Sequence, residues 1–105
     1  MAKDRIGRSV VHSSIVDGRK VCGTAGTAEA LSSTSLLVSY TILTAETDNT
    51  GAIAIGASTV VAAVATRRGI PLNAGDSISL GAVDLADVYL DSAVSGDGLT
   101  YMYLS

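Results

Sequence analysis

The amino-acid sequence predicts an all-β chain: a small antiparallel β-sandwich or jelly-roll-like domain with an extended N-terminal arm. Three observations lead to this prediction. Short segments alternate apolar and polar residues with a period of two, Gly- and Asp-rich turns separate them, and helical periodicity is scarce. A length of 105 residues suits one domain. We therefore divide the chain into an arm over residues 1–20 and a single domain over residues 21–105.

The first half of the chain contains one clear strand. Residues 19–23 can form a short strand before a turn-like run of small residues. The clearest strand spans residues 35–44, with Leu36, Val38, Tyr40 and Ile42 on one face and Leu37, Ser39, Thr41 and Leu43 on the other. Residues 30–45 carry no charge, so this strand should be central in its sheet or covered by a partner.

The middle of the chain is less regular. A polar turn over residues 46–51 precedes a short strand over residues 52–56. Residues 58–69 remain open between two structures. Ser58 as an N-cap and Gly69 after the last turn favour a helix, whereas the density of valines favours extended chain.

The C-terminal third alternates more clearly. Residue Ile70 precedes Pro71 and should be extended, and residues 77–80 alternate as a strand. The apolar phase slips at Ala86-Asp87, which predicts a bulge or a single tight turn. Segments 89–93 and 99–104 then form a predicted hairpin across the Gly-rich residues 94–98.

The last predicted strand is apolar on both faces. Leu99, Tyr101 and Tyr103 form one face, and Met102 and Leu104 form the other. A strand with two apolar faces is normally buried on both sides. In so thin a domain, we expect the second side to contact another subunit.

Composition predicts assembly. The chain is 48% hydrophobic and only 16% charged, with four Tyr and neither Phe nor Trp. A monomer of this size needs more charge to cover its surface. We therefore expect a homo-oligomer, with a trimer favoured, or a subunit of a larger assembly.

The charges are divided along the chain. All seven basic residues precede Gly69, and residues 69–105 hold five aspartates and no base. The basic start of the chain is either a solvated terminus or an arm that docks on an acidic neighbour. Nucleic-acid binding is not expected, because bases are few and stacking aromatics are missing beside them.

Residues that could carry chemistry are isolated. The single His12 and the single Cys22 form no recognisable nucleophile–base pattern, and Gly23-x-x-Gly26 lacks the lysine of a phosphate loop. Asp84, Asp87, Asp91 and Asp97 match no calcium-loop spacing, although a calcium site stays open. Residues 49–66 are uncharged but too weakly apolar for a membrane helix, and no signal peptide is expected. We expect no enzyme activity, no cofactor and no membrane partner.

One block of the sequence resembles a known group of proteins. Residues 69–72 (Gly-Ile-Pro-Leu), 74–80 (Ala-Gly-Asp-Ser-Ile-Ser-Leu), 84–89 (Asp-Leu-Ala-Asp-Val-Tyr) and 101–104 (Tyr-Met-Tyr-Leu), preceded by the short strand at 52–56, resemble small structural proteins of tailed bacteriophages. This resemblance covers about half of the chain, and it implies a virion component on the capsid surface. The expected role is a decoration or cementing subunit that binds the major capsid protein or other virion subunits.

The predicted contact residues combine the arm and two strands. They are Lys3, Arg5, Arg8, Leu37, Leu43, Tyr101 and Tyr103. The alternative role is a head-fibre, neck or tail component that binds a receptor or a glycan. A membrane-active protein is a third, less favoured class.

Overall fold

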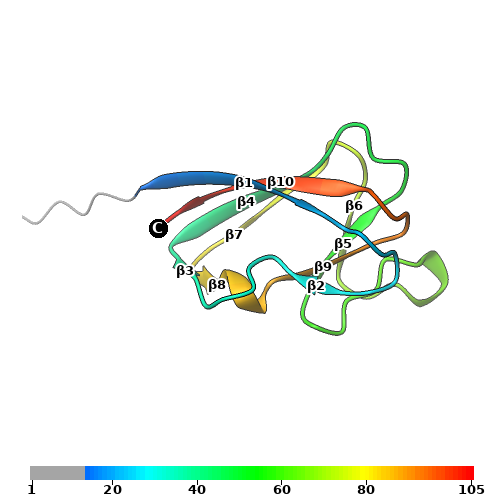
Figure 1. The fold of residues 1–105 in the computed structure, drawn as a ribbon, viewed down its shortest axis with the longest axis horizontal. Helices are drawn as coiled ribbons and strands as arrows, with labels where there is room; N and C mark the ends of the chain where they lie inside the picture. The colour runs from blue at the N-terminus through cyan, green and yellow to red at the C-terminus, as the bar shows by residue number, and fades with distance from the viewer. Residues whose placement is uncertain (1–13) are drawn as a thin grey trace, which may run out of the picture.

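The computed structural model describes residues 14–105 and is nearly all β (Figure 1). Two four-stranded antiparallel sheets form the body of the fold, and a two-stranded ribbon joins them at one end. The strands of the first sheet, in spatial order, are β1 (Ile15–Val21), β10 (Gly98–Leu104), β4 (Tyr40–Ala45) and β7 (Ser77–Leu80). Those of the second are β2 (Glu29–Ala30), β9 (Tyr89–Ser92), β5 (Ile53–Gly56) and β6 (Ile70–Leu72). The ribbon pairs β3 (Leu37–Val38) with β8 (Val83–Asp84).

The strand order is that of a jelly roll. The first main strand pairs with the last, β2 pairs with β9, β4 pairs with β7, and β5 pairs with β6. The chain therefore runs as one long double strand that folds over itself, with the β3–β8 ribbon at the bend between the two sheets. The predicted all-β, jelly-roll-like class is confirmed.

The core lies between the two sheets. The first sheet contributes Leu43, Ala45 and Leu99, and the second contributes Ile53, Ile55, Leu72 and Leu90. Thr41 is also fully buried, and its hydroxyl donates to the carbonyl oxygen of Met102 at 2.9 Å. Strand alternation thus directs every second residue of β4 and β10 into the core, as the period of two requires.

The strand predicted over residues 35–44 is interrupted at Ser39. The backbone N–H of Ser39 donates to the carbonyl of Leu104 at 2.9 Å, and β3 and β4 join different sheets on either side of it. This break shifts the phase, so Val38 is buried while Tyr40 and Ile42 lie on the outer face with Thr44. The single-strand prediction with Val38 and Ile42 on one face is therefore corrected.

The arm boundary also moves. Residues 15–20, which the sequence assigned to the arm, belong to β1 and pair with β10 along their whole length. The charged residues of this segment led to the arm assignment. They are compatible with a strand at the edge of a sheet, where one side of the strand contacts solvent. Residues 1–13, with Lys3, Arg5 and Arg8, lie outside the described residues.

Three C-terminal predictions have different outcomes. The phase slip at Ala86-Asp87 is confirmed as a single 3-10 turn, η2 (Leu85–Asp87). Residues 58–69 are an extension of the β5–β6 hairpin, closed by a bridge between Val61 and Arg68, with one 3-10 turn, η1 (Val64–Thr66), at its tip. The predicted β9–β10 hairpin is wrong, because β9 and β10 lie in different sheets. Their glycine-rich connection crosses between sheets because β10 gains longer partners in β1 and β4.

Aspartates fix the loops at the ends of the sheets. Asp97 accepts the backbone N–H groups of Thr50 and Gly51 at 3.0 and 2.8 Å. Asp84 accepts those of Leu36 and Ala86, both at 2.9 Å. These carboxylates thus serve as acceptors for backbone groups that no strand satisfies.

Candidate protein-interaction surface

The outer face of the β1-β10-β4-β7 sheet carries an apolar patch. Register places Leu104 between Ile15 and Tyr40, and Met102 between Asp17 and Ile42. We call the five apolar side chains of this face the outer patch: Ile15, Tyr40, Ile42, Met102 and Leu104. Ile15 is 69% exposed and Tyr40 is 38% exposed, and the other three are partly exposed. The patch is continuous across three neighbouring strands.

Polar residues border the outer patch on two sides. Thr44 and Thr100 continue the same face, and the hydroxyls of Thr44 and Ser77 lie 2.6 Å apart. An open hollow here is lined by Asp17, Arg19, Ile42, Thr44, Thr100 and Met102, together with Gly18 and Tyr101. An apolar centre with a polar border is the usual arrangement of a protein-binding surface.

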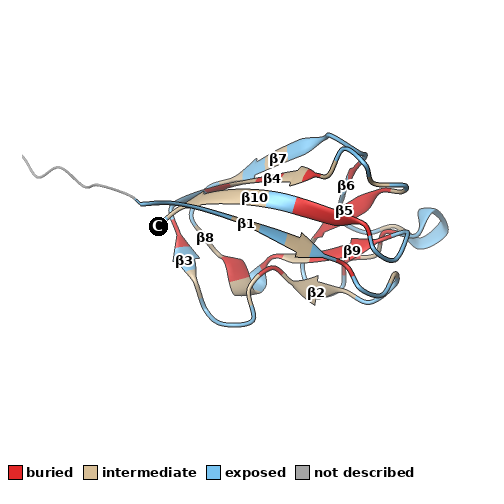
Figure 2. Ribbon diagram, turned by 45° about the horizontal axis from the view of Figure 1, so that its top comes forward, coloured by how far each residue is buried: buried red, intermediate tan, exposed pale blue. Residues whose placement is uncertain are grey.

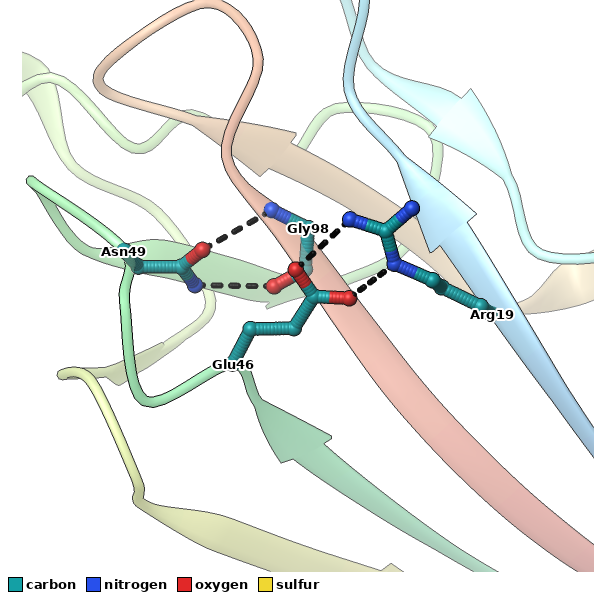
Figure 3. A network of polar contacts seen from close by, with 4 residues as sticks. All are labelled: Arg19, Glu46, Asn49 and Gly98. Atoms are coloured by element: carbon teal, nitrogen blue, oxygen red, sulfur yellow. Dashed lines mark hydrogen bonds and ion pairs between the residues drawn. The ribbon is translucent and has the colours of Figure 1, made fainter.

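An ion pair fixes the polar border (Figure 3). Arg19 donates through Nε and Nη2 to both carboxylate oxygens of Glu46, with Nη2 and Oε1 3.0 Å apart. This pairing lowers the pKa of the Glu46 carboxyl and raises that of the Arg19 guanidinium, chiefly through the hydrogen bond itself. The Arg19 side chain is 60% exposed, so the pair positions β1 more than it stabilises the fold.

Gly98 lets this pair form. The Asn49 side chain donates to the Gly98 carbonyl at 2.8 Å and accepts the Gly98 N–H at 2.9 Å, as a neighbouring strand would (Figure 3). A Cβ at position 98 would lie 3.1 Å from Oε1 of Glu46. The glycine therefore makes room for the carboxylate to reach across β10 to Arg19.

The opposite sheet has its outer face covered by the chain itself. Val60 and Ala62, from the β5–β6 hairpin extension, pack with Ala54 in a second small core, against Ala28 and Tyr89. Asp91, which is 1% exposed, holds this cover in place. Its carboxylate accepts the N–H of Gly26 at 2.9 Å and that of Ala62 at 2.8 Å. Within residues 14–105, no such cover lies on the outer patch.

The predicted contact residues divide into three groups. Leu37 is 75% exposed, so a partner could reach it. Leu43 has no exposed surface and belongs to the core. Tyr101 and Tyr103 lie on the inward side of β10, where they stack with ring centroids 6.3 Å apart and pack against the core.

The last strand therefore has two apolar faces, as expected, but the face with Tyr101 and Tyr103 is the inward one. The side that looks outward is Met102 and Leu104, because the inward side follows Leu99, which is fully buried. Sequence alternation identified both faces but could not say which was inward. Nothing within the strand itself marks the inward face, because Tyr101 lies over Gly18 of the neighbouring β1, where a Cβ would lie 2.5 Å from its ring.

The residue types that could carry chemistry are isolated in the described part of the chain. Cys22 is a buried free thiol, and burial raises its pKa. Within the described part of the chain, no group of three or more His, Cys, Asp or Glu side chains is placed to hold a metal ion. His12 lies outside the described residues. No helix among residues 14–105 is long and apolar enough to cross a membrane.

Comparisons with protein-family models, with curated protein sequences and with solved structures found no match to this chain. What the fold and the surface define is a class: a small jelly-roll domain with one sheet face covered by its own chain and one apolar face uncovered.

Proposed function

We propose that this chain is a structural protein that binds neighbouring protein subunits through the outer patch. The observation that supports this most directly is the difference between the two sheets. The chain covers the outer face of the β2-β9-β5-β6 sheet with Val60 and Ala62, whereas Ile15 and Tyr40 stay exposed on the other. An apolar, uncovered sheet face with a polar border fits a docking surface.

The proposed setting is the surface of a phage virion. There the chain would act as a capsid decoration or cementing subunit on the major capsid protein or another virion subunit. The resemblance of residues 69–104 to small structural proteins of tailed phages supports this setting. Jelly rolls are frequent in capsid proteins, but they also occur in lectins, so the fold is compatible with the role without selecting it.

The size of the outer face indicates that it does not bind alone. Four strands about 4.8 Å apart and about 20 Å long project onto roughly 400 Å². A standard interface needs about 800 Å² from each partner. The predicted contacts of Lys3, Arg5 and Arg8 would supply part of the difference by docking on acidic groups of the partner.

Binding to particles tests the proposal. Ile42→Lys and Met102→Lys place a charge in the outer patch, and we expect each to weaken binding to purified particles at least tenfold. Ala63→Lys is the matched control, because Ala63 is exposed on the hairpin extension that covers the opposite sheet. Equal binding by all three variants, with circular dichroism confirming that each is folded, would contradict the proposed surface.

The arm has a separate test. Because β1 begins at Ile15, the deletion must stop before it, and removing residues 1–13 leaves the sheet intact. We expect that truncation to lower affinity for particles and to weaken its dependence on salt. Undiminished binding by the truncated chain would remove the arm from the proposal.

The second candidate is a head-fibre, neck or tail component that binds a receptor or a glycan. The open hollow beside Arg19, Thr44 and Thr100 favours it, since polar groups around an apolar floor suit a sugar. A glycan array distinguishes the two candidates: specific glycan binding that Thr100→Lys abolishes would favour the second.

A further inference from the structure

Strand β1 is an edge strand that is unusually open to pairing. It runs for seven residues, and β10 is its only strand partner among residues 14–105. Figure 2 shows most of β1 exposed. Ile15 is 69% exposed, and Val16 and Val21 are each 38% exposed. A long exposed edge strand with apolar residues is a ready template for another strand, unless charges or a partner protect it.

The hydrogen-bond pattern shows which backbone groups of β1 face outward. At one end the N–H of Ser105 donates to the carbonyl of Ser14 at 3.0 Å, and at the other the N–H of Cys22 donates to the carbonyl of Asp97 at 2.9 Å. In an antiparallel pair, bonded positions alternate along the strand. The even-numbered residues of β1 therefore bond to β10, and the odd-numbered residues direct their N–H and C=O groups to the open edge. These are Ile15, Asp17, Arg19 and Val21.

The sequence of β1 is complementary to itself about Gly18. When two copies run antiparallel with Gly18 opposite Gly18, Asp17 of each copy faces Arg19 of the other, and Ile15 faces Val21. Because all four of these residues direct their backbone groups outward, every outward N–H and C=O finds a partner in this register. We propose that β1 pairs with β1 of a second copy in this register, joining two β1-β10-β4-β7 sheets into one continuous eight-stranded sheet.

The charges select this register over its neighbours. A shift of the centre to position 17 would place Asp17 opposite Asp17, and a shift to position 19 would place Arg19 opposite Arg19. Directly opposed like charges destabilise a strand pair. Arg19 uses Nε and Nη2 for Glu46, and a guanidinium has five N–H donors, so it can serve both carboxylates. The same side chain that fixes β1 to its own sheet thus also faces Asp17 of the second copy.

Gly18 suits the centre of the pair. The two glycines put no side chains against each other across the pair, and the ring of Tyr101 covers the inward side of the glycine. The other edge of this sheet is a weaker candidate. Strand β7 is only four residues long, and its sequence, Ser-Ile-Ser-Leu, has no charge that would fix a register.

This pairing gives a two-fold dimer, which differs from the trimer favoured in the sequence analysis. Strand pairing along one edge buries less than a standard interface, so we expect association in the micromolar range or weaker. It uses the edge of the sheet, whereas the outer patch lies on one face, and Ile15 is the one residue of β1 that belongs to both.

Charge exchange is the first test, with sedimentation equilibrium on the full chain as the readout. Asp17→Lys places a positive charge opposite Arg19 of the second copy, and we expect dimerisation to weaken at least tenfold. Asp87→Lys is the matched control, because Asp87 is exposed in η2, outside the β1-β10-β4-β7 sheet. Mixing the Asp17→Lys chain with an Arg19→Asp chain restores opposite charges, so the mixture should associate more strongly than either variant alone.

Disulfide trapping is the second test and does not depend on affinity. In the proposed register Val16 faces Lys20 of the other copy in a non-hydrogen-bonded pair, where Cα atoms are about 4.5 Å apart. Val16→Cys with Lys20→Cys, in a Cys22→Ser background, should therefore form a covalent dimer on mild oxidation. The two cysteines of one chain lie about 13 Å apart along the strand and cannot join each other.

The trapping control shifts the register. Asp17→Cys with Val21→Cys, in the same background, should give no more than a few per cent of dimer. A monomer at all concentrations with no trapped dimer, a trimer, or equal trapping by both cysteine pairs would overturn the proposal.

Discussion

Removing the Asp91 carboxylate should be among the most damaging single substitutions in this chain. Asp91 is 1% exposed and accepts two backbone N–H groups, one from Gly26 and one from Ala62. A hydrogen bond to a charged group contributes about 1.5–3 kcal/mol. Gly26 is exposed, so water can replace the carboxylate there, whereas Ala62 is fully buried and its N–H would be left without a partner. We therefore expect Asp91→Ala to lower the free energy of unfolding by about 3–4 kcal/mol.

That loss is a large part of the total stability. A domain of this size is stable by about 5–15 kcal/mol, and each kcal/mol lost lowers Tm by about 4–8 °C. Urea unfolding followed by circular dichroism measures the change directly. Asp87→Ala is the control, since Asp87 is an exposed aspartate four residues earlier. Unfolding free energies for the two variants within about 0.5 kcal/mol of each other would refute the role given to Asp91.

Three further predictions concern the fold. Gly69→Ala should lower the free energy of unfolding, measured in urea, by at least about 1–2 kcal/mol. Gly69 has φ +100°, and a Cβ there would lie 2.5 Å from the carbonyl oxygen of Ile55. An unchanged urea midpoint would contradict this. The hydrogen bond from the Ser35 hydroxyl, with two backbone N–H groups, lowers the pKa of Asp84. The ionised Asp84 carboxylate therefore stabilises the fold above about pH 4, and this stabilisation is lost as the pH falls further. Asp84→Asn should make the free energy of unfolding depend less steeply on pH in the acid range. A dependence as steep as that of the wild type would rule this out. Burial raises the pKa of the Cys22 thiol, so we expect a thiol reagent near neutral pH to modify it only after unfolding, and rapid labelling of the native chain would count against this.

Much of the fold was predictable because it rests on local patterns. Strand alternation located β5 and β7, and the phase slip at Ala86-Asp87 located η2. Turn chemistry marked the loops. These signals depend on neighbouring residues and need no knowledge of partners.

The errors came from features that only tertiary structure fixes. The glycine-rich segment before β10 has the sequence of a hairpin, yet the pairing of β10 with β1 and β4 separates it from β9. Likewise, Asp17 and Lys20 made β1 resemble a polar arm, because an edge strand tolerates charges that a central strand would not.

The structure changes which residues of the last strand are accessible to a partner. A terminal strand with two apolar faces indicated an uncovered surface, and such a surface exists at Met102 and Leu104. Tyr101 was expected there but lies inward over Gly18, where the missing side chain leaves room for its ring. Which face of a strand is inward depends on its neighbours across the sheet, and no single segment contains that information.

An electron cryomicroscopy map of particles that carry this chain tests the central claim most directly. We predict that density of a neighbouring subunit covers Ile42 and Met102 on the outer face of the β1-β10-β4-β7 sheet, while the hairpin extension around Val64 remains exposed to solvent. A map in which the neighbour contacts the hairpin extension and leaves the outer patch in solvent would contradict it.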